Sequence, residues 1–477
     1  MKKIRSVLGI ILSFAIVFSA MDIKSLAKDY DYRINRTIVV DGTTLGDIKT
    51  LDYNYRNDTY VSLRGLAAAL KGTSKAFAVD ITANDINITT GVNADGEIPF
   101  FTEEENNTAV SPKYGRKEIY VDGSERFYYT IAAQGTDGAA DCYMAVVDAA
   151  MMLNLDIEIN DGIISVNTGN NFYVSGEDLE ESGYLMGVNG LVIGDGTTGE
   201  VYYAYNESQD FAIASTTKLM TYLVYMDAVS KGEVGLKDCV VISREAQMLS
   251  ETEDGSTPMK EGQSVSVTEL MEGLLLPSSN ECAYTLACHV AGSEEAFVDR
   301  MNTMAEDLGL NSAIFYNSHG LPMFDDVMLP AKKQNHMSAE DMFTLSAYIM
   351  QEYPEITGIT SVKKAKLSSF GKEVKNTNAL LYNLPKVKGL KTGTTNKSGA
   401  CLVSCMPVEK DGVTHNLIVV LLGAEGNMER NRISEIGARY ALSVFNSSSS
   451  GTATEKLKVM PKDPNKVVQR LVNNAKL

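Results

Sequence analysis

The residues Ala214-Ser-Thr-Thr-Lys-Leu-Met220 place a serine, Ser215, three positions ahead of a lysine, Lys218. On a helix these two positions share one face, so the lysine amine can reach the serine hydroxyl. A serine hydroxyl is a weak nucleophile until a base takes its proton. A lysine can be that base only when burial or a nearby cation lowers its pKa. The apolar residues after Lys218 predict a helix that enters a core, with Ser215 at its start.

The spacing alone is weak, because Ser-x-x-Lys also begins at Ser25, Ser361 and Ser369. Two later motifs distinguish the Ser215 copy from the other three. Pro277-Ser-Ser-Asn280 follows an apolar run and precedes a predicted helix, and Lys391-Thr-Gly393 lies on a predicted strand. These motifs occur in this order only once in the chain.

The ordered trio resembles that of the serine DD-peptidases, the penicillin-binding proteins. Within them it is most similar to the low-molecular-weight D-alanyl-D-alanine carboxypeptidases of peptidase family S11. The resemblance runs from about Gly190 to Phe445 and includes Asn317-Ser-His-Gly-Leu321. It implies an α/β (α+β) DD-peptidase/β-lactamase-like fold, in which an antiparallel sheet is flanked by helices.

The resemblance also implies catalytic roles, those of a serine carboxypeptidase acting on peptidoglycan stem pentapeptides. Ser215 would attack the carbonyl between two terminal D-alanines and become acylated. Lys218 would take its proton, with Lys391 nearby holding the Lys218 pKa down. Ser278 would relay that proton to the leaving amine. This chemistry requires no cofactor.

The same resemblance implies a substrate-binding set. Asn280 would offer its amide to the substrate backbone, and Lys391 with Thr392 would attract the free carboxylate of the last D-alanine. Gly393 would let the substrate lie along the strand edge as an added strand. The backbone N–H groups of Ser215 and Thr394 would form the oxyanion hole.

This chain departs from the family pattern at three positions. Ser279 stands where glycine is usual, Glu281 where aspartate is usual, and Ser318 where proline is usual. The middle residue of the second motif is expected to face away from the site. His319, beside Ser318, is expected to be structural rather than catalytic.

Three alternative functions remain open at this point. A β-lactamase shares the trio but needs a carboxylate that activates water, and Asp307–Asn311 loosely mimics such a segment. The helical stripe Phe297–Leu308 with Gly309 as a helix stop accounts for that segment better. A DD-endopeptidase and a non-catalytic wall-binding protein are the other two.

The region Arg33–Gly169 precedes the trio and contains an internal repeat. Val-Asp-Gly42 and Val-Asp-Gly123 each precede a helix-like stretch, Val61–Leu70 or Met144–Leu153, and a pair of strands ending in Thr-Gly. The polar linker Asn93–Lys117 separates the copies. The region resembles the copper amine oxidase-like N-terminal domain, but it holds no histidine for a copper site.

The remaining elements are predicted from hydrophobic periodicity. The motifs and these elements together predict four regions of the chain. They are a signal peptide over 1–27, a repeat domain over 33–169, a catalytic domain over 183–446 and a flexible tail over 447–477. The predicted elements of the catalytic domain are a hairpin over Gly190–Tyr205, helices over Asn280–Val290, Glu295–Leu308 and Arg430–Phe445, and strands over Ala400–Met406 and Leu417–Gly423.

The first residues combine Lys2, Lys3 and Arg5 with the apolar run Val7–Phe18 and predict export to the cell exterior or wall. The signal or the basic tail would be the means of any peripheral membrane contact. Loss of residues 1–27 removes four positive charges and one negative, so the formal net charge changes from −18 to −21. So acidic a chain is a poor partner for nucleic acid. Stem peptides are the expected substrates and β-lactam antibiotics the expected inhibitors.

The six cysteines are sparse and lack CxxC pairs, so most are expected to be buried thiols. Cys401 and Cys405 on one strand would lie about 13 Å apart, too far to form a disulfide. The four histidines are scattered without metal-ligand spacing, and no metal site is predicted.

Overall fold

The computed structural model describes residues 31–53, 58–110, 113–115, 117–134, 140–181, 183–185, 187–252, 255–323 and 333–447. The predicted signal peptide lies outside the described residues, and so does the predicted tail apart from its first residue. The chain divides into two compact units, Met1–Phe172 and Tyr173–Leu477, and each has a buried hydrophobic core of its own.

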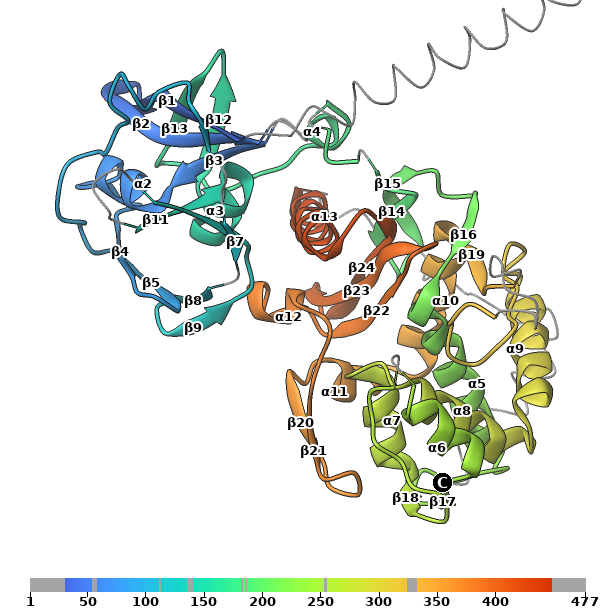
Figure 1. Ribbon diagram of the computed structural model, residues 1–477. Coiled ribbons are helices and arrows are strands. Elements are labelled where there is room, and N and C mark those ends of the chain that lie inside the picture. Colours follow the sequence, from blue (N-terminus) through green and yellow to red (C-terminus); the bar gives the residue numbers. More distant parts are fainter. Residues whose placement is uncertain are drawn as a thin grey trace, which may run out of the picture. The chain divides into compact units, whose positions relative to one another are not determined.

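In the first unit, the described residues form strands and two helices (Figure 1). Its first half contains β1 (Asp31–Val40), β2 (Thr43–Tyr53), β3 (Asp58–Ser62), α2 (Leu63–Ala69), β4 (Phe77–Ile81) and β5 (Asp85–Thr90). Its second half contains β6 (Ala109–Val110), β7 (Lys113–Gly115), β8 (Glu118–Val121), β9 (Ser124–Arg126), β10 (Thr130–Gln134), β11 (Ala140–Ala145), α3 (Val146–Leu153), β12 (Asp156–Asn160) and β13 (Ile163–Asn167).

The two repeat copies exchange their terminal hairpins. The hairpin β4–β5 of the first copy joins β8–β9 of the second, through a parallel pairing of β5 with β8. The hairpin β12–β13 of the second copy joins β1–β2 of the first, through a parallel pairing of β13 with β1. Between these, β3 pairs with β11 in antiparallel fashion. The copies therefore form one interlocked fold rather than two adjacent subdomains.

The Val-Asp-Gly motif of each copy binds the Thr-Gly motif of the other. Asp41 accepts hydrogen bonds from the Thr168 backbone N–H at 2.8 Å and from its hydroxyl at 2.6 Å. Asp122 accepts the same pair from Thr90, at 2.9 and 2.6 Å. These bonds lower the pKa of both carboxyl groups, because hydrogen bonds to an ionised carboxylate favour its charged form. The recurrence of the two motifs thus marks reciprocal contacts.

Two predictions for this region were wrong in detail. The helices begin at Leu63 and Val146, because the apolar residues just before them belong to β3 and β11, which pair with each other. The predicted linker is not a simple spacer, since it supplies β6, which pairs with β1, and β7, which pairs with β10.

The second unit holds the three sequence motifs. Its strands are β14 (Gly190–Asp195), β15 (Glu200–Tyr205), β16 (Asp210–Ala212), β17 (Cys239–Val241), β18 (Ser264–Ser266), β19 (His336–Ser338), β20 (Lys364–Leu367), β21 (Lys372–Lys375), β22 (Gly389–Thr395), β23 (Gly399–Lys410) and β24 (Val413–Ala424). Its helices are α4 (Gly176–Glu181), the 3-10 turn η1 (Ala214–Thr217), α5 (Lys218–Ser230), α6 (Arg244–Ser250), α7 (Val267–Leu275), α8 (Asn280–Ala291), α9 (Glu294–Leu308), α10 (Ala339–Glu352), α11 (Ile356–Thr360), α12 (Leu380–Asn383) and α13 (Asn427–Ser447). The predicted catalytic domain omits α4, which belongs to this unit.

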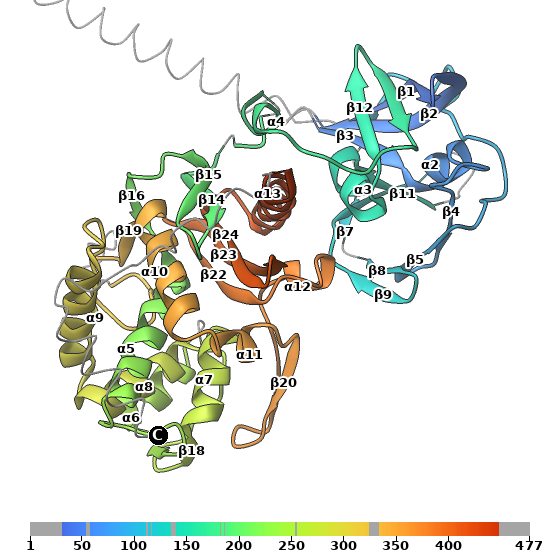
Figure 2. The same cartoon turned by 180° about the vertical axis from the view of Figure 1, so that it is seen from behind.

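A five-stranded antiparallel sheet in the order β15-β14-β24-β23-β22 carries helices on both faces (Figures 1 and 2). Side chains alternate along β24, so Val419 faces Gly437 of α13 while Ile418, like Ala347 of α10, lies beside Gly196. This arrangement confirms the predicted fold class. It also leaves β22, the strand with Lys-Thr-Gly, at one edge of the sheet.

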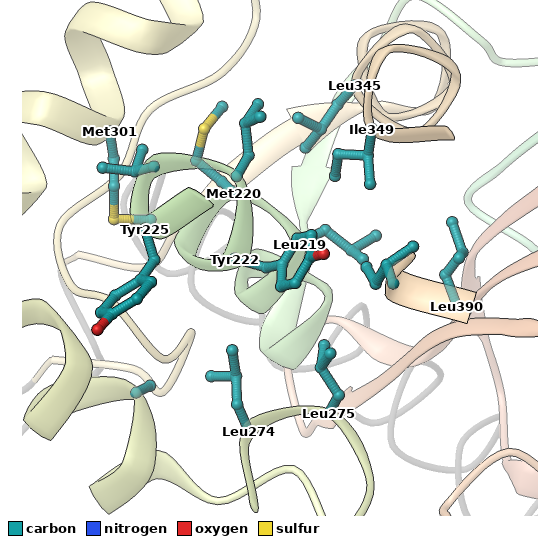
Figure 3. Close-up of a cluster of buried hydrophobic side chains, with 14 of the residues drawn as sticks. Leu219, Met220, Tyr222, Tyr225, Leu274, Leu275, Met301, Leu345, Ile349 and Leu390 are labelled. Atoms are coloured by element: carbon teal, nitrogen blue, oxygen red, sulfur yellow. The ribbon is translucent and has the colours of Figure 1, made fainter. Parts of the chain in front are cut away.

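Helix α5 is the centre of the second core. Every residue from Lys218 to Met226 is buried, which is typical of a helix enclosed on all sides. Figure 3 shows Leu219 and Tyr222 of α5 among side chains of α7, α9, α10 and β22. The core therefore fixes the helix whose first residue is Lys218.

The cysteines behave as predicted for buried thiols. Cys142, Cys282, Cys401 and Cys405 are buried, Cys288 is half-buried and Cys239 is exposed, and all six are free. Among the described residues, no helix has the length and apolar character needed to cross a membrane.

Candidate active site

Ser215 lies in η1, directly before α5, as the sequence predicts. The preceding residue, Ala214, has φ +46°, in the left-handed region that costs a non-glycine residue energy. The backbone of Gly320 packs tightly against Ala214. A Cβ on Gly320 would lie only 2.0 Å from the Ala214 carbonyl oxygen. Glycine has no Cβ and also tolerates the φ of +92° at this position, so Gly320 allows the Asn317–Leu321 segment to pack against η1.

The Lys218 amine has three neighbours within hydrogen-bond distance. Its Nζ lies 2.9 Å from Ser215 Oγ, 2.8 Å from Asn280 Oδ1 and 2.8 Å from the His319 carbonyl oxygen. The last two atoms can only accept hydrogen bonds. A neutral amine has two N–H donors and one lone pair, so an unprotonated Lys218 that donates to both of these acceptors keeps its lone pair for the Ser215 hydroxyl. This is the geometry of a base that takes the serine proton.

Burial is the main cause of the Lys218 pKa shift. The side chain is completely buried, and loss of solvent lowers its pKa from 10.5 to about 7, against an opposing effect of Glu281. The prediction that Lys391 holds this pKa down was wrong, because burial alone lowers the pKa of Lys218 and the charge of Lys218 lowers that of Lys391 instead. Lys391 is itself buried, and burial, then Lys218, then Arg430 lower its pKa well below the ordinary value.

Burial also separates the Ser215 copy of Ser-x-x-Lys from two others. Lys364 and Lys372, which end the copies starting at Ser361 and Ser369, are exposed. Neither amine therefore shares the enclosed environment of Lys218. The copy that begins at Ser25 lies outside the described residues.

The second motif forms the entrance to α8. Ser278 has φ +69°, and among the described residues its side chain makes no hydrogen bond. Ser279 is buried and caps α8, accepting a hydrogen bond from the Cys282 N–H at 3.0 Å, so the middle residue does face away from the site. Asn280 holds Lys218 through its oxygen, a role that the sequence analysis did not assign.

Glu281, the next departure from the family pattern, follows Asn280 in the first turn of α8. It is fully buried, and its Oε1 accepts hydrogen bonds from the backbone N–H groups of Ser256 and Thr257. It thereby fixes the 256–257 segment beside the helix. The longer side chain has a structural use here and leaves the trio intact.

The third motif lies on edge strand β22. Lys391 Nζ donates to the Thr392 carbonyl oxygen at 2.9 Å, and the Thr392 and Thr377 hydroxyl oxygens are 2.6 Å apart. A Cβ on Gly393 would lie 2.9 Å from the Ile213 oxygen and 3.0 Å from the Ser215 nitrogen. Close packing of β22 on η1 therefore requires this glycine, a reason that the sequence analysis did not consider.

Arg430 of α13 is a second residue that the sequence analysis missed. It is buried, and its guanidinium donates to Thr394 Oγ1 at 3.3 Å, while Thr394 Oγ1 donates to the Gly393 carbonyl oxygen at 2.8 Å. Its charge also contributes to the lowered pKa of Lys391. No motif or spacing identifies Arg430, because it reaches the site from a helix 36 residues beyond Thr394.

His319 contributes its backbone rather than its ring. Burial lowers the pKa of the imidazole to about 3, with a smaller effect of Lys218, so the ring is neutral at physiological pH. Its Nδ1 accepts the Leu321 N–H at 3.1 Å. The expected structural role fits these contacts, while the His319 carbonyl is one of the two acceptors of Lys218.

The segment considered for a water-activating carboxylate is a helix end. Asp307 lies in the last turn of α9, and Gly309 caps that helix with φ +74°. The prediction that the helical stripe explains this segment is confirmed. Within the described ranges, no group of three or more metal-ligating side chains is assembled.

Comparisons with known proteins identify the family of this chain. A family model described as D-alanyl-D-alanine carboxypeptidase, Peptidase S11, matches residues 186–426. The chain is 32% identical over 237 residues to D-alanyl-D-alanine carboxypeptidase DacF of Bacillus subtilis (strain 168), covering 49% of this chain and 57% of that protein. It is 36% identical over 238 residues to DacD of Escherichia coli (strain K12), covering 49% and 58%.

The chain thus spans less than two thirds of the length of these curated relatives. A solved structure of penicillin binding protein 6B from Escherichia coli is 34% identical, covers 55% of this chain and 77% of its own, and has a TM-score of 0.47. The family match takes in just over half of the chain and the whole trio from Ser215 to Gly393. The chain belongs to the Peptidase S11 family of D-alanyl-D-alanine carboxypeptidases.

Proposed function

We propose that the protein is a serine carboxypeptidase that removes the terminal D-alanine from peptidoglycan stem pentapeptides. The observation that carries this proposal is the buried Lys218 amine, whose Nζ lies 2.9 Å from Ser215 Oγ and 2.8 Å from the acceptor oxygens of both Asn280 and His319. A pKa of about 7 leaves much of this amine neutral at physiological pH. Family membership supports the same chemistry.

The first half of the reaction makes an ester on Ser215. Its Oγ attacks the carbonyl carbon between the two D-alanines while Lys218 Nζ takes the hydroxyl proton. The C–N bond then breaks, and the proton passes to the leaving amine through Ser278. Backbone N–H groups of Ser215 and Thr394 stabilise the oxyanion. Water then hydrolyses the ester in the second half and releases the shortened peptide.

The substrate carboxylate binds at Lys391 and Thr392 in this proposal. A carboxylate beside Lys391 would favour the charged form of that lysine and reverse part of the pKa lowering that burial causes. Arg430, next to Thr394, adds a second positive charge behind the same strand. A preference for a free terminal carboxylate is what distinguishes an exopeptidase from an endopeptidase.

Release of free D-alanine tests the assignment. Wild type incubated with a peptide that ends in D-Ala-D-Ala should liberate D-alanine, whereas Ser215→Ala should liberate none. The same peptide with an amidated terminus should react much more slowly, because the carboxylate contact is lost. Equal rates on the two peptides would favour the endopeptidase alternative, and turnover by the Ser215→Ala variant would exclude Ser215 as the nucleophile.

The β-lactamase alternative receives less support. It requires a carboxylate placed to activate water, and the segment considered for that purpose is the capped end of α9. β-Lactam antibiotics are instead proposed as slowly released inhibitors that acylate Ser215. We also propose that the protein is exported and acts at the cell wall, where stem peptides are found, with the first unit as a spacer or wall-contacting module.

A further inference from the structure

Asn335 lies at the junction of two segments that meet at the nucleophile. One is η1, which carries Ser215, and the other is the loop Asn317–Gly320, which carries the His319 carbonyl. The Asn335 side chain is completely buried, yet it belongs to none of the three sequence motifs. A buried amide must place all its donors and acceptors, so its partners show what it holds.

Both polar atoms of the Asn335 side chain, and its backbone oxygen, are used at this junction. Its Oδ1 accepts the backbone N–H groups of Tyr316 at 2.7 Å and Asn317 at 3.3 Å. Its Nδ2 donates to the Asn317 carbonyl oxygen at 2.9 Å and to Thr217 Oγ1 at 3.1 Å, with a longer contact of 3.3 Å to Asn317 Oδ1. Its backbone oxygen accepts the Ile213 N–H at 3.1 Å.

The Asn317 side chain carries this constraint to Lys218. Asn317 Oδ1 accepts the N–H groups of His319 at 3.2 Å and of Gly320 at 2.6 Å, which fixes the peptide groups of the loop. The His319 carbonyl then accepts from Lys218 Nζ. Glu294 and Thr221 also hold Ser318, but they attach the loop to α9 and α5. Asn335 attaches it to the turn that carries the nucleophile.

We propose that Asn335 is a positioning residue for the reaction, which holds the His319 carbonyl in register with Ser215 so that the Lys218 lone pair stays directed at the serine hydroxyl. This inference rests on the proposed function. Asn335 touches no reacting atom, so its loss should leave substrate binding at β22 intact. The defect should appear in the rate of acylation.

The experiment follows acylation by benzylpenicillin in stopped-flow or quenched intact-mass measurements over a range of drug concentrations. The variant is Asn335→Leu, which is neutral and similar in shape but makes none of these hydrogen bonds. Its limiting acylation rate constant should fall about ten- to a hundred-fold, with little change in the half-saturating concentration. Partial misfolding would instead lower the fraction of protein trapped without changing the limiting rate.

A matched control is Asn302→Leu. Asn302 makes the same kind of bridge away from the nucleophile, donating to the Val298 and Phe315 oxygens at 3.1 and 3.0 Å and accepting the Phe315 N–H at 2.9 Å. It should lose stability but keep the wild-type limiting rate. An equal fall in the rate for both variants, or none for a folded Asn335→Leu, would overturn the proposal.

A second variant decides the matter if Asn335→Leu does not fold. Thr217→Val keeps the shape of a buried residue and removes only the hydroxyl that accepts from Asn335. It should also slow acylation at saturating drug, and a wild-type limiting rate would contradict the proposal. Failure of the wild type itself to acylate would count against the proposed function rather than against the role of Asn335.

Discussion

Burial of Lys218 lowers the stability of the fold but favours the proposed reaction. A lysine buried without a carboxylate bonded to its amine destabilises the fold in its charged form, and the chain tolerates this at one end of its central helix. The same burial brings the pKa to about 7, where a base works best at physiological pH. In the proposed reaction, Ser215 therefore depends on the core that surrounds α5 as much as on the motif.

The first prediction concerns the pH dependence of stability. The unfolded chain holds the Lys218 proton up to about pH 10.5, whereas the folded chain releases it near 7. Between these values the unfolded state binds more protons, so this residue makes stability rise with pH. The unfolding free energy of wild type minus that of Lys218→Met should rise between pH 7 and 10, by at most about 1.4 kcal/mol per unit. Urea unfolding measures it, and a flat or falling difference would contradict the assigned pKa.

The second prediction concerns Gly320. A Cβ there would lie 2.0 Å from the Ala214 oxygen, so Gly320→Ala should displace the loop from η1 and abolish acylation. Gly309→Ala is the control, because it has φ +74° and open space around its Cβ position. It should cost only the left-handed backbone penalty, roughly 1–2 kcal/mol, and keep its activity. An active Gly320→Ala variant would show that the contact is not required.

The sequence motifs identify site residues that lie close together in the chain. They do not identify the residues that tertiary packing brings to the site from other segments. The spacing of Ser215 and Lys218 points to the proposed nucleophile and base, because helix geometry links them locally. Thr377, Arg430 and Asn335 lie at the site through tertiary packing alone, so no spacing points to them. The Asn280 contact with Lys218 was missed for another reason, since the motif gives the residue but not the direction of its oxygen.

At the scale of elements, hydrophobic periodicity placed most helices and strands of the second unit. The predicted hairpin over Gly190–Tyr205 and the predicted helix Glu295–Leu308 match β14–β15 and α9 closely. Periodicity failed where a buried strand runs directly into a helix, as at Ser62, because both are apolar. It also could not reveal the exchange of hairpins, since an exchanged strand and a local one have the same pattern.

The third prediction tests this exchange in the first unit. Asp41→Ala and Asp122→Ala each remove both hydrogen bonds between a Val-Asp-Gly motif and the Thr-Gly motif of the other copy, whereas the Asn variants can still accept the Thr168 or Thr90 N–H. The alanine variants should melt at lower temperature than their asparagine counterparts, in a transition separate from that of the second unit. Because both carboxyl groups have lowered pKa values, the wild-type advantage should vanish as pH falls through those values. Identical melting of all four variants at neutral pH would contradict the reciprocal arrangement.

At the scale of the whole molecule, all three motifs and their contacts lie within the second unit. The fourth prediction follows from this placement. A chain that begins at Tyr173 should fold and release D-alanine from a soluble peptide at a rate close to that of the full protein. Loss of activity in a truncated protein with a normal circular dichroism spectrum and cooperative melting would mean that the first unit helps to build the site.

The most direct test of the central claim is the covalent species that forms with benzylpenicillin. The drug mimics the D-Ala-D-Ala amide, so intact-mass spectrometry of wild type should show one added drug mass that lasts for minutes or longer. Peptide mapping should place it on Ser215, and Ser215→Ala should gain none even though Ser361 and Ser369 also precede lysines. Rapid turnover without a trapped adduct, or an adduct on Ser278, would contradict the account.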